Sequence, residues 1–259
     1  MTALDEAFAL LTPDRLLRDP NADGRGVRIA VVDTGIDRAV ITQRHPGHEP
    51  VESYSLRGGG EFVRDDKPPS GPHGTTVADI ILKLAPRATL LSLDVFAPNT
   101  SDVDSVVAAI RFAIGTGRAN LVNLSLGIAD RVLQNVPKRQ ALYRAIEEAY
   151  YAGVTVIAAA NNDHPFAVSY PAAFGPPLIG VDKGLFADPL NFTYELRDKI
   201  EFQAHGRGDL GPFAREPATS WATPHLTGIA ARLLSLKPDL KPFEVKSLLY
   251  RLARHAPVL

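Results

Sequence analysis

The sequence predicts an α/β protein, with a three-layer α/β/α architecture around a mainly parallel central sheet. Short runs that are apolar throughout alternate with segments of helical periodicity over most of the 259 residues. Strands that are apolar at every position are typical of a parallel sheet that helices cover on both faces. The predicted strands are Val27 to Val32, Ala88 to Phe96, Leu121 to Leu126, Val154 to Ala160 and Leu178 to Val181.

The helical segments follow a spacing that gives each of them one apolar face. In the segment from Asp102, for example, Val103, Val106, Val107 and Ile110 fall on one side. The predicted helices are Val77 to Leu84, Asp102 to Ile114, Lys138 to Tyr151, about Trp221 to Leu236 and about Phe243 to Ala253. The stretch from Gln43 to Ser70, rich in Gly, Pro and charge, is expected to be a long surface loop. Without repeats or low-complexity linkers, we expect one domain over residues 1–259, in which residues 1–25 are an extension with a short helix.

Composition excludes several function classes. The formal net charge of −1 does not favour nucleic acid or an anionic membrane as partner, and no apolar run approaches the roughly 20 residues that span a bilayer. The absence of cysteine excludes disulfides, thiolate metal sites and a thiol nucleophile. The amino terminus carries Asp5 and Glu6 and no basic region, so we expect a cytoplasmic protein, or a secreted one if this is a trimmed mature form.

Four polar residues stand where a predicted strand or helix begins or ends: Asp33, His73, Asn162 and Ser220. Each alone is ordinary, because Ser is a common N-cap and Asn a common turn residue. Asp-Thr-Gly after a strand also occurs in phosphotransfer folds and in aspartic proteases, but the latter need a second such motif, which this sequence lacks. Together they supply the hydroxyl, imidazole and carboxylate of serine acyl transfer, in the order Asp…His…Ser, and a donor for the oxyanion.

Six segments in this order resemble the signature blocks of the subtilase family. They are VVDTGID, HGTTVA, VNLSLG, AAANN, VSYPAAF and TSWATPHLTG, and the closing KPDLKPFEVKSLLYRLA resembles the last helix of the family. The likeness extends from about Arg25 to Ala253 and implies a subtilisin-like fold.

The resemblance implies a role for each matching residue. Asp33, His73 and Ser220 would form the catalytic triad, and Asn162 would form the oxyanion hole with the backbone N–H of Ser220. An extended peptide or protein substrate would pair with Ser125, Leu126 and Gly127. The specificity pocket would have Ala159, Ala160 and Asn161 as one wall, Ser169 as floor and Asp163 at its rim.

Two of these positions leave alternatives open. Asp163 either favours a basic side chain at the cleavage residue or is a solvated turn carboxylate. Trp221 stands where the family commonly has Met, on the leaving-group side of the cleft, and either packs there or offers a stacking surface to the substrate.

The sequence also departs from the family pattern. Asp79 replaces a Gly after the catalytic His, and Asn161 and the pair Pro217-Ala218 stand where Gly is usual, which puts the local backbone in doubt. The helix after His73 leaves no room for the calcium-binding loop of many members, so we expect no cofactor and no strong calcium site, while a weak one stays open. His45 and His48 have metal-like spacing, but the family has a similar His-Pro loop, so we expect no metal there.

The predicted function is a serine endopeptidase that works through an acyl-enzyme intermediate. Only about 25 residues precede the first strand, too few for the inhibitory propeptide typical of the family. We therefore expect narrow specificity, or an activating or inhibitory protein partner. The alternatives are a catalytically silent peptide-binding module with the same fold, and a peptide-processing transpeptidase.

Overall fold

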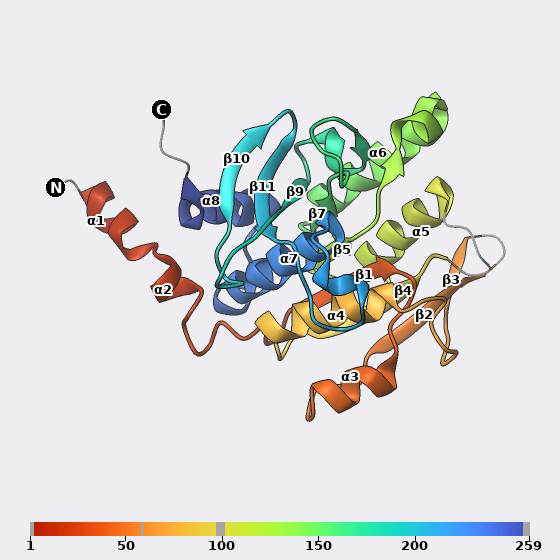
Figure 1. Cartoon of the computed structure of the whole chain (residues 1–259), viewed down its shortest axis with the longest axis horizontal. Helices are drawn as coiled ribbons and strands as arrows, with labels where there is room; N and C mark the ends of the chain where they lie inside the picture. The colour runs from red at the N-terminus through yellow and green to blue at the C-terminus, as the bar shows by residue number, and fades with distance from the viewer. Residues whose placement is uncertain (1–2, 58–59, 97–101, 256–259) are drawn as a thin grey trace.

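The computed structural model describes residues 3–57, 60–96 and 102–255. Over these residues a sheet of ten strands has the order β12-β10-β11-β9-β7-β5-β1-β4-β2-β3, and helices lie on both of its faces (Figure 1). The strands pair in parallel except for two antiparallel neighbours, β2 with β3 and β10 with β11. A separate antiparallel pair joins β6 to β8. The predicted three-layer α/β/α class with a mainly parallel sheet is thereby confirmed.

The strands are β1 (Arg28–Asp33), β2 (Glu52–Arg57), β3 (Glu61–Arg64), β4 (Thr89–Asp94), β5 (Leu121–Leu124), β6 (Ile128–Ala129), β7 (Thr155–Ala159), β8 (Ser169–Tyr170), β9 (Ile179–Gly184), β10 (Thr193–Arg197), β11 (Ile200–His205) and β12 (Arg254–His255). The α-helices are α1 (Ala3–Leu10), α2 (Pro13–Leu16), α3 (Arg38–Arg44), α4 (His73–Leu84), α5 (Val103–Ile114), α6 (Val136–Tyr151), α7 (Thr219–Leu236) and α8 (Pro242–Leu252). The short 3₁₀ helices in the described ranges are η1 (Asp130–Gln134), η2 (Ala172–Phe174) and η3 (Phe213–Arg215).

Two apolar cores lie on opposite faces of the sheet. Along β1, Ile29 and Val31 belong to the core shared with α4, α7 and α8, whereas Ala30 and Val32 belong to the core shared with α5 and α6. Alternate side chains of a strand point to opposite faces, so burial on both faces requires an apolar residue at every position. The predicted apolar strands are therefore confirmed, and they form the centre of the sheet because both of their faces are buried.

Helices α4 and α7 pack side by side and start at the same edge of the sheet (Figure 1). Their contact is close because Gly228 lacks a side chain, and a Cβ atom there would lie 2.8 Å from the Cβ atom of Leu84. Since the predicted nucleophile and the predicted base lie in the first turns of these helices, their packing decides the geometry of the site.

The expectation of a long surface loop from Gln43 to Ser70 is wrong. The segment contains the hairpin β2–β3, and β2 extends the sheet by pairing in parallel with β4. All but the last residue of β2 are half-buried, and its residues are mostly polar, so it lacks the continuous apolar pattern of the central strands. The ion pair between Arg28 and Glu52, with Nη1 3.0 Å from Oε1, helps to hold this edge in place.

Candidate active site

Asp33 and His73 meet where β1 ends and α4 begins. The Nδ1 atom of His73 lies 2.9 Å from each carboxylate oxygen of Asp33. The side chain of Asp33 is buried, and the backbone N–H of Thr34 donates to its Oδ1 atom over 2.7 Å. The helix approaches the strand this closely because residue 74 is Gly: a Cβ atom there would lie 2.3 Å from the carbonyl oxygen of Gly35.

The pKa of the His73 imidazole lies above its ordinary value. Burial of the ring lowers the pKa, but the hydrogen bond to Asp33 and the charge of that carboxylate outweigh burial. A carboxylate at Nδ1 also fixes the tautomer, so that in the neutral ring Nε2 is free to accept a proton. This is the state that a general base requires.

Ser220 lies in the first turn of α7 and is half-buried. In the part of the chain that the structure describes, no hydrogen bond joins it to His73. Trp221, the residue after Ser220, connects the two residues. Its ring packs on the His73 ring with a centroid separation of 4.7 Å and an interplanar angle of 33°. Trp221 is itself buried, with 6% of its surface exposed, so His73 and the core cover most of it.

Asn162 follows β7 and is held by the residue before Ser220. Its Oδ1 atom accepts hydrogen bonds from the backbone N–H of Thr219 over 2.9 Å and from the Thr219 hydroxyl at 3.1 Å. The same hydroxyl lies 2.8 Å from the carbonyl oxygen of Ala160. Because the amide oxygen is engaged in this way, the NH₂ group of Asn162 is the side that remains to donate to a ligand.

The predicted substrate-pairing residues Ser125, Leu126 and Gly127 continue beyond β5 and belong to no strand. Ser125 is buried, and its Oγ atom accepts from Asn123 Nδ2 over 2.9 Å. Asn123 in turn accepts from Thr227 of α7 over 2.9 Å, which ties this segment to the helix of the predicted nucleophile.

Ser169, the predicted floor of the specificity pocket, lies against Gly127. A Cβ atom on Gly127 would lie 2.9 Å from the Oγ atom of Ser169, which is buried without a hydrogen-bond partner. The predicted wall residues Ala159 and Ala160 are buried at the end of β7, and Asp163 is exposed. The predicted pocket residues are thus gathered around the ends of β5 and β7.

The positions where Gly is usual adopt backbone that other residues tolerate. Among the described non-glycine residues, a positive φ occurs only at Arg118 and Asp198, and Ala218 is extended with φ −142° and ψ 150°. The side chain of Asn161 also contributes to the local structure, because its Oδ1 atom accepts a hydrogen bond from the backbone N–H of Asp163 over 2.9 Å. The backbone doubt raised by the missing glycines is therefore removed.

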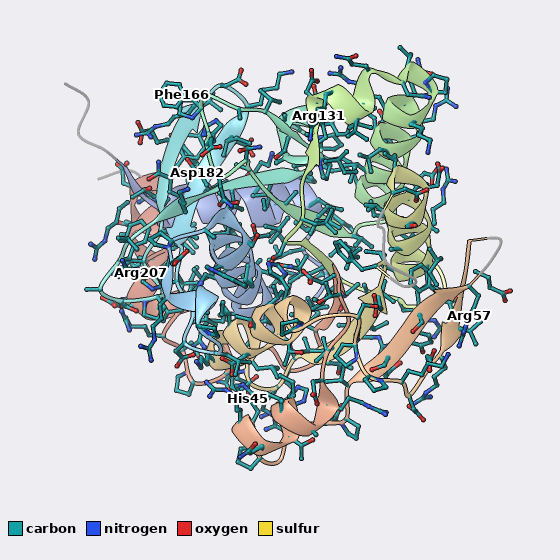
Figure 2. All side chains as sticks on the ribbon, turned by 45° about the vertical axis from the view of Figure 1, so that its right-hand side comes forward. His45, Arg57, Arg131, Phe166, Asp182 and Arg207 are labelled. Carbon is teal, nitrogen blue, oxygen red and sulfur yellow. The ribbon has the colours of Figure 1, made fainter. Side chains whose placement is uncertain are left out.

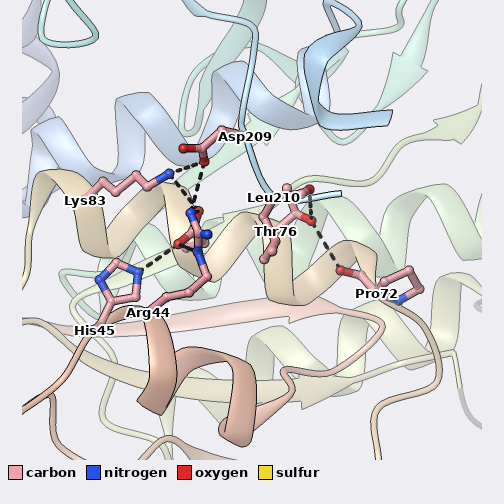
Figure 3. Close-up of polar contacts among 8 residues, drawn as sticks. Arg44, His45, Pro72, Thr76, Lys83, Asp209 and Leu210 are labelled. Carbon is pink, nitrogen blue, oxygen red and sulfur yellow. Dashed lines mark hydrogen bonds and ion pairs between the residues drawn. The ribbon is translucent and has the colours of Figure 1, made fainter. Parts of the chain in front are cut away.

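Asp79, which replaces another Gly, is fully buried and holds three basic side chains, Arg44, His45 and Lys83, which Figure 3 labels. Its carboxylate lies 2.8 Å from Arg44 Nε, 2.9 Å from His45 Nε2 and 3.0 Å from Lys83 Nζ. Burial raises the pKa of this carboxyl, but the hydrogen bonds from the three partners outweigh it and hold the pKa below its usual value. Arg44 and Lys83 also contact Asp209, so the cluster joins α3 and α4 to the loop before η3.

The course of α4 bears on the expectation that the calcium-binding loop of the family is absent, which stays a prediction. This helix runs without interruption from His73 to Leu84, and a short turn leads from it to β4. Among the described residues, no group of three or more His, Asp or Glu side chains is placed to hold a metal ion. His45 and His48 have different partners, Asp79 and the carbonyl oxygen of Ala88. No helix in the described ranges is long and apolar enough to cross a membrane.

Sequence reasoning missed the residues that support the site. These are Thr219, Asn123, Asp182, Lys183 and His164. Thr219 could have been found as the residue before the predicted nucleophile. Nothing in the spacing of Asp182 and Lys183 in β9, however, signals that they lie beside the turn after β7 that contains Asn162. That neighbourhood results from the strand order β9-β7.

Comparison with known proteins identifies the family of this chain. The sequence profile of the Subtilase family matches residues 24–183 and 202–258. M-protease of Shouchella clausii (strain KSM-K16) is 27% identical over 250 residues, which cover 86% of this chain and 58% of that protein. Subtilisin Savinase of Lederbergia lenta is also 27% identical over 250 residues, with 86% and 82% covered. The chain thus spans little more than half the length of M-protease.

Solved structures show the same fold. The S41 psychrophilic protease superposes with a TM-score of 0.71 and 23% identity over 92% of this chain and 87% of that one. The serine protease MycP1, described as an essential component of the type VII (ESX-1) secretion system, gives a TM-score of 0.68 and 22% identity, with 94% and 82% covered. The predicted subtilisin-like fold is confirmed, and the chain belongs to the subtilase family.

Proposed function

We propose that this protein is a serine endopeptidase that cleaves peptide bonds through an acyl-enzyme intermediate. The observation that carries the proposal is the contact of His73 Nδ1 with both oxygens of the buried Asp33, beside the helix whose first turn contains Ser220. Membership of the subtilase family supports it.

In the proposed reaction, His73 Nε2 accepts the hydroxyl proton of Ser220 as Oγ attacks the carbonyl carbon of the scissile bond. The negative charge on the carbonyl oxygen would be stabilised by the Asn162 NH₂ group and the Ser220 backbone N–H. The imidazolium, held by Asp33, then protonates the departing amine, and water repeats the sequence to hydrolyse the ester. An extended substrate would pair with Ser125–Gly127.

We propose further that the activity is restrained, either by narrow specificity or by a protein partner, and that no calcium ion is required. The continuous α4 and the ionic cluster around Asp79 support the second point, because they join α3, α4 and the loop before η3 through side chains of the chain itself.

Labelling with a fluorophosphonate probe tests the function. The intact protein should be labelled, and Ser220→Ala should abolish labelling while leaving the melting temperature nearly unchanged. Mass analysis of peptide products, with and without added amine nucleophile, separates hydrolysis from transpeptidation. A folded protein that binds peptides but never labels, with or without candidate partners, would instead be a silent binding module.

A further inference from the structure

Two adjacent residues near the end of β9 contact the turn that carries Asn162. We call residues 162–167 the Asn162 turn. The Nζ atom of Lys183 donates to the carbonyl oxygen of Asn162. Beside it, Asp182 Oδ2 lies 3.2 Å from His164 Nδ1, and both side chains are more than nine-tenths buried. In the sheet, β9 and β5 lie on opposite sides of β7. The substrate would bind on the β5 side, so these contacts lie on the side away from it.

The Asn162 turn has little packing of its own. Asn162, Asp163, Pro165 and Phe166 are all exposed, and Phe166, at 96%, projects from the molecule beyond Asp182 (Figure 2). An exposed turn of this kind opens easily unless specific contacts hold it. His164 is the residue through which the turn reaches the buried interior.

The same part of β9 is connected to the residues before Ser220. The N–H of Gly206 donates to the carbonyl oxygen of Gly184 over 2.8 Å, and the N–H of Ala218 donates to that of Gly206 over 3.0 Å. Gly206 also lies so close to Lys183 that a Cβ atom on it would be 2.9 Å from the Lys183 Cβ atom.

Together these contacts form a continuous set of hydrogen bonds around the predicted oxyanion site. Lys183 holds the backbone of Asn162, and Thr219 holds its side-chain oxygen. Ala218, the residue before Thr219, is joined through Gly206 to the residue after Lys183. The position of the Asn162 amide relative to Ser220 therefore depends on the contacts of β9. A displacement of about 1 Å in such a group can reduce a rate on the order of 10²-fold.

We propose that Lys183 and the Asp182–His164 pair are positioning residues that hold the Asn162 amide where it donates to the oxyanion. The inference rests on the proposed function. It predicts that Lys183 affects the transition state more strongly than it affects substrate binding, although Lys183 need not touch the substrate.

Lys183→Met is the main test, because it removes the ammonium group and keeps most of the side-chain length. We expect kcat to fall by about 10- to 100-fold with KM changed less than about threefold. The inhibition constant of a peptide boronic acid, which forms a tetrahedral adduct with serine, should rise by the same factor. Lys183→Arg should restore most of the activity. Lys237→Met, at the exposed lysine that follows α7, is the matched control.

A double-mutant cycle tests whether Lys183 acts through Asn162. In an Asn162→Ala background, Lys183→Met should change kcat by less than about threefold, because the group that it positions is gone. Additive losses would overturn the inference, as would a Lys183→Met enzyme with wild-type kcat.

Hydrogen exchange provides a readout that does not need activity. Backbone amides of the Asn162 turn should exchange faster in Lys183→Met and in Asp182→Asn than in the wild-type protein, while amides of α8 should not change. If the wild-type protein neither labels nor cleaves, the proposed function fails, and this comparison still decides whether Lys183 and Asp182 hold the Asn162 turn. Unchanged exchange in both variants would contradict it.

Discussion

The indole ring of Trp221 packs on the imidazole ring of His73, with ring centroids 4.7 Å apart. Trp221 is the only tryptophan of the chain, so tryptophan fluorescence reports on the surroundings of this one ring. A protonated imidazole beside an indole quenches its emission, and the pKa of His73 lies above 6.5. We predict that emission rises as the pH is raised through the pKa of His73, with a midpoint above pH 6.5.

Two controls belong to this titration. The pH-dependent change of emission should persist in Ser220→Ala, which removes catalysis but not the ring contact. It should disappear in His73→Gln, which removes the titrating imidazole. The second nearby imidazole, His225, has its pKa lowered to about 4, so its titration falls in a separate pH range. Emission that stays flat between pH 5.5 and 9 on the wild-type protein would contradict the contact.

The same pKa predicts the pH dependence of activity. A general base must be neutral, so kcat/KM should be lost as the pH falls below the pKa of His73, which lies above 6.5. Asp33→Asn removes the charge that raises this pKa and the acceptor that fixes the tautomer. We expect kcat to fall about 10⁴-fold and the acid limb of the profile to move to lower pH. Steady-state kinetics over pH 5–9 checks both effects, and an acid limb that stays in place in Asp33→Asn would contradict them.

The sequence allowed prediction of the parts of the structure that have a strong local pattern. Buried strands such as β1 are apolar at every position, and the residues around Asp33 and Ser220 match motifs of a known family. The hairpin β2–β3 could not be predicted, because a half-buried edge strand of mostly polar residues resembles a loop. Likewise, the contacts of Lys183 and Asp182 depend on which strands are neighbours, and no local pattern encodes that.

The two readings of Trp221 illustrate the same limit. Its position in the sequence allowed both a packing role and a stacking surface for substrate. Only three-dimensional packing shows that His73 covers the ring and that 6% of the residue is exposed. A substitution at this site should therefore act on stability: Trp221→Ala should lower the free energy of unfolding by about 3–5 kcal/mol. Urea denaturation of the wild-type protein, Trp221→Ala and Trp221→Met, which has the residue common in the family, checks this. A Trp221→Ala variant as stable as the wild-type protein would contradict it.

Removal of divalent metal should have little effect on this protein. Helix α4 is continuous, and side chains of the chain itself join α3, α4 and the loop before η3. We predict that excess EDTA, or millimolar calcium, shifts the melting temperature by less than about 2 °C, which corresponds to about 1 kcal/mol or less for a domain of this size. A large stabilisation by calcium in differential scanning fluorimetry would show that an ion site exists elsewhere.

His225 should make the protein less stable in mildly acidic solution. Burial lowers its pKa to about 4, although a hydrogen bond to the carbonyl oxygen of Trp221 opposes this. The unfolded chain binds a proton below about pH 6.5 that the folded chain does not bind, so stability falls as the pH drops from 6.5 to 4. The loss from this residue alone is about 3 kcal/mol. Urea denaturation at pH 7, 5.5 and 4.5 measures it. The half-buried His205, whose pKa is also lowered, adds to the same trend.

His225→Leu provides the comparison for this prediction. It removes the titrating ring and the hydrogen bond from its Nδ1 atom to the carbonyl oxygen of Trp221, so it should be less stable than the wild-type protein at pH 7. Between pH 6.5 and 4.5, however, its stability should change less than that of the wild type. Parallel pH profiles would contradict the assignment.

Asp79 should affect stability in a different pH range. Its pKa is lowered below 3.8 by Arg44, Lys83 and His45, so its contribution is complete above pH 3.8 and is lost as the pH falls through the lower, folded-state value. At pH 7, Asp79→Asn leaves the three basic groups facing a neutral amide. Arg44 and Lys83 are about one-third exposed, so water can solvate part of their charge, and we expect a loss on the order of 2–3 kcal/mol, below the 3–5 kcal/mol typical of a fully buried pair. Asp209→Asn, at an exposed partner of the same cluster, should cost less than about 1 kcal/mol. If the two variants proved equally stable, the buried carboxylate would not be the centre of the cluster.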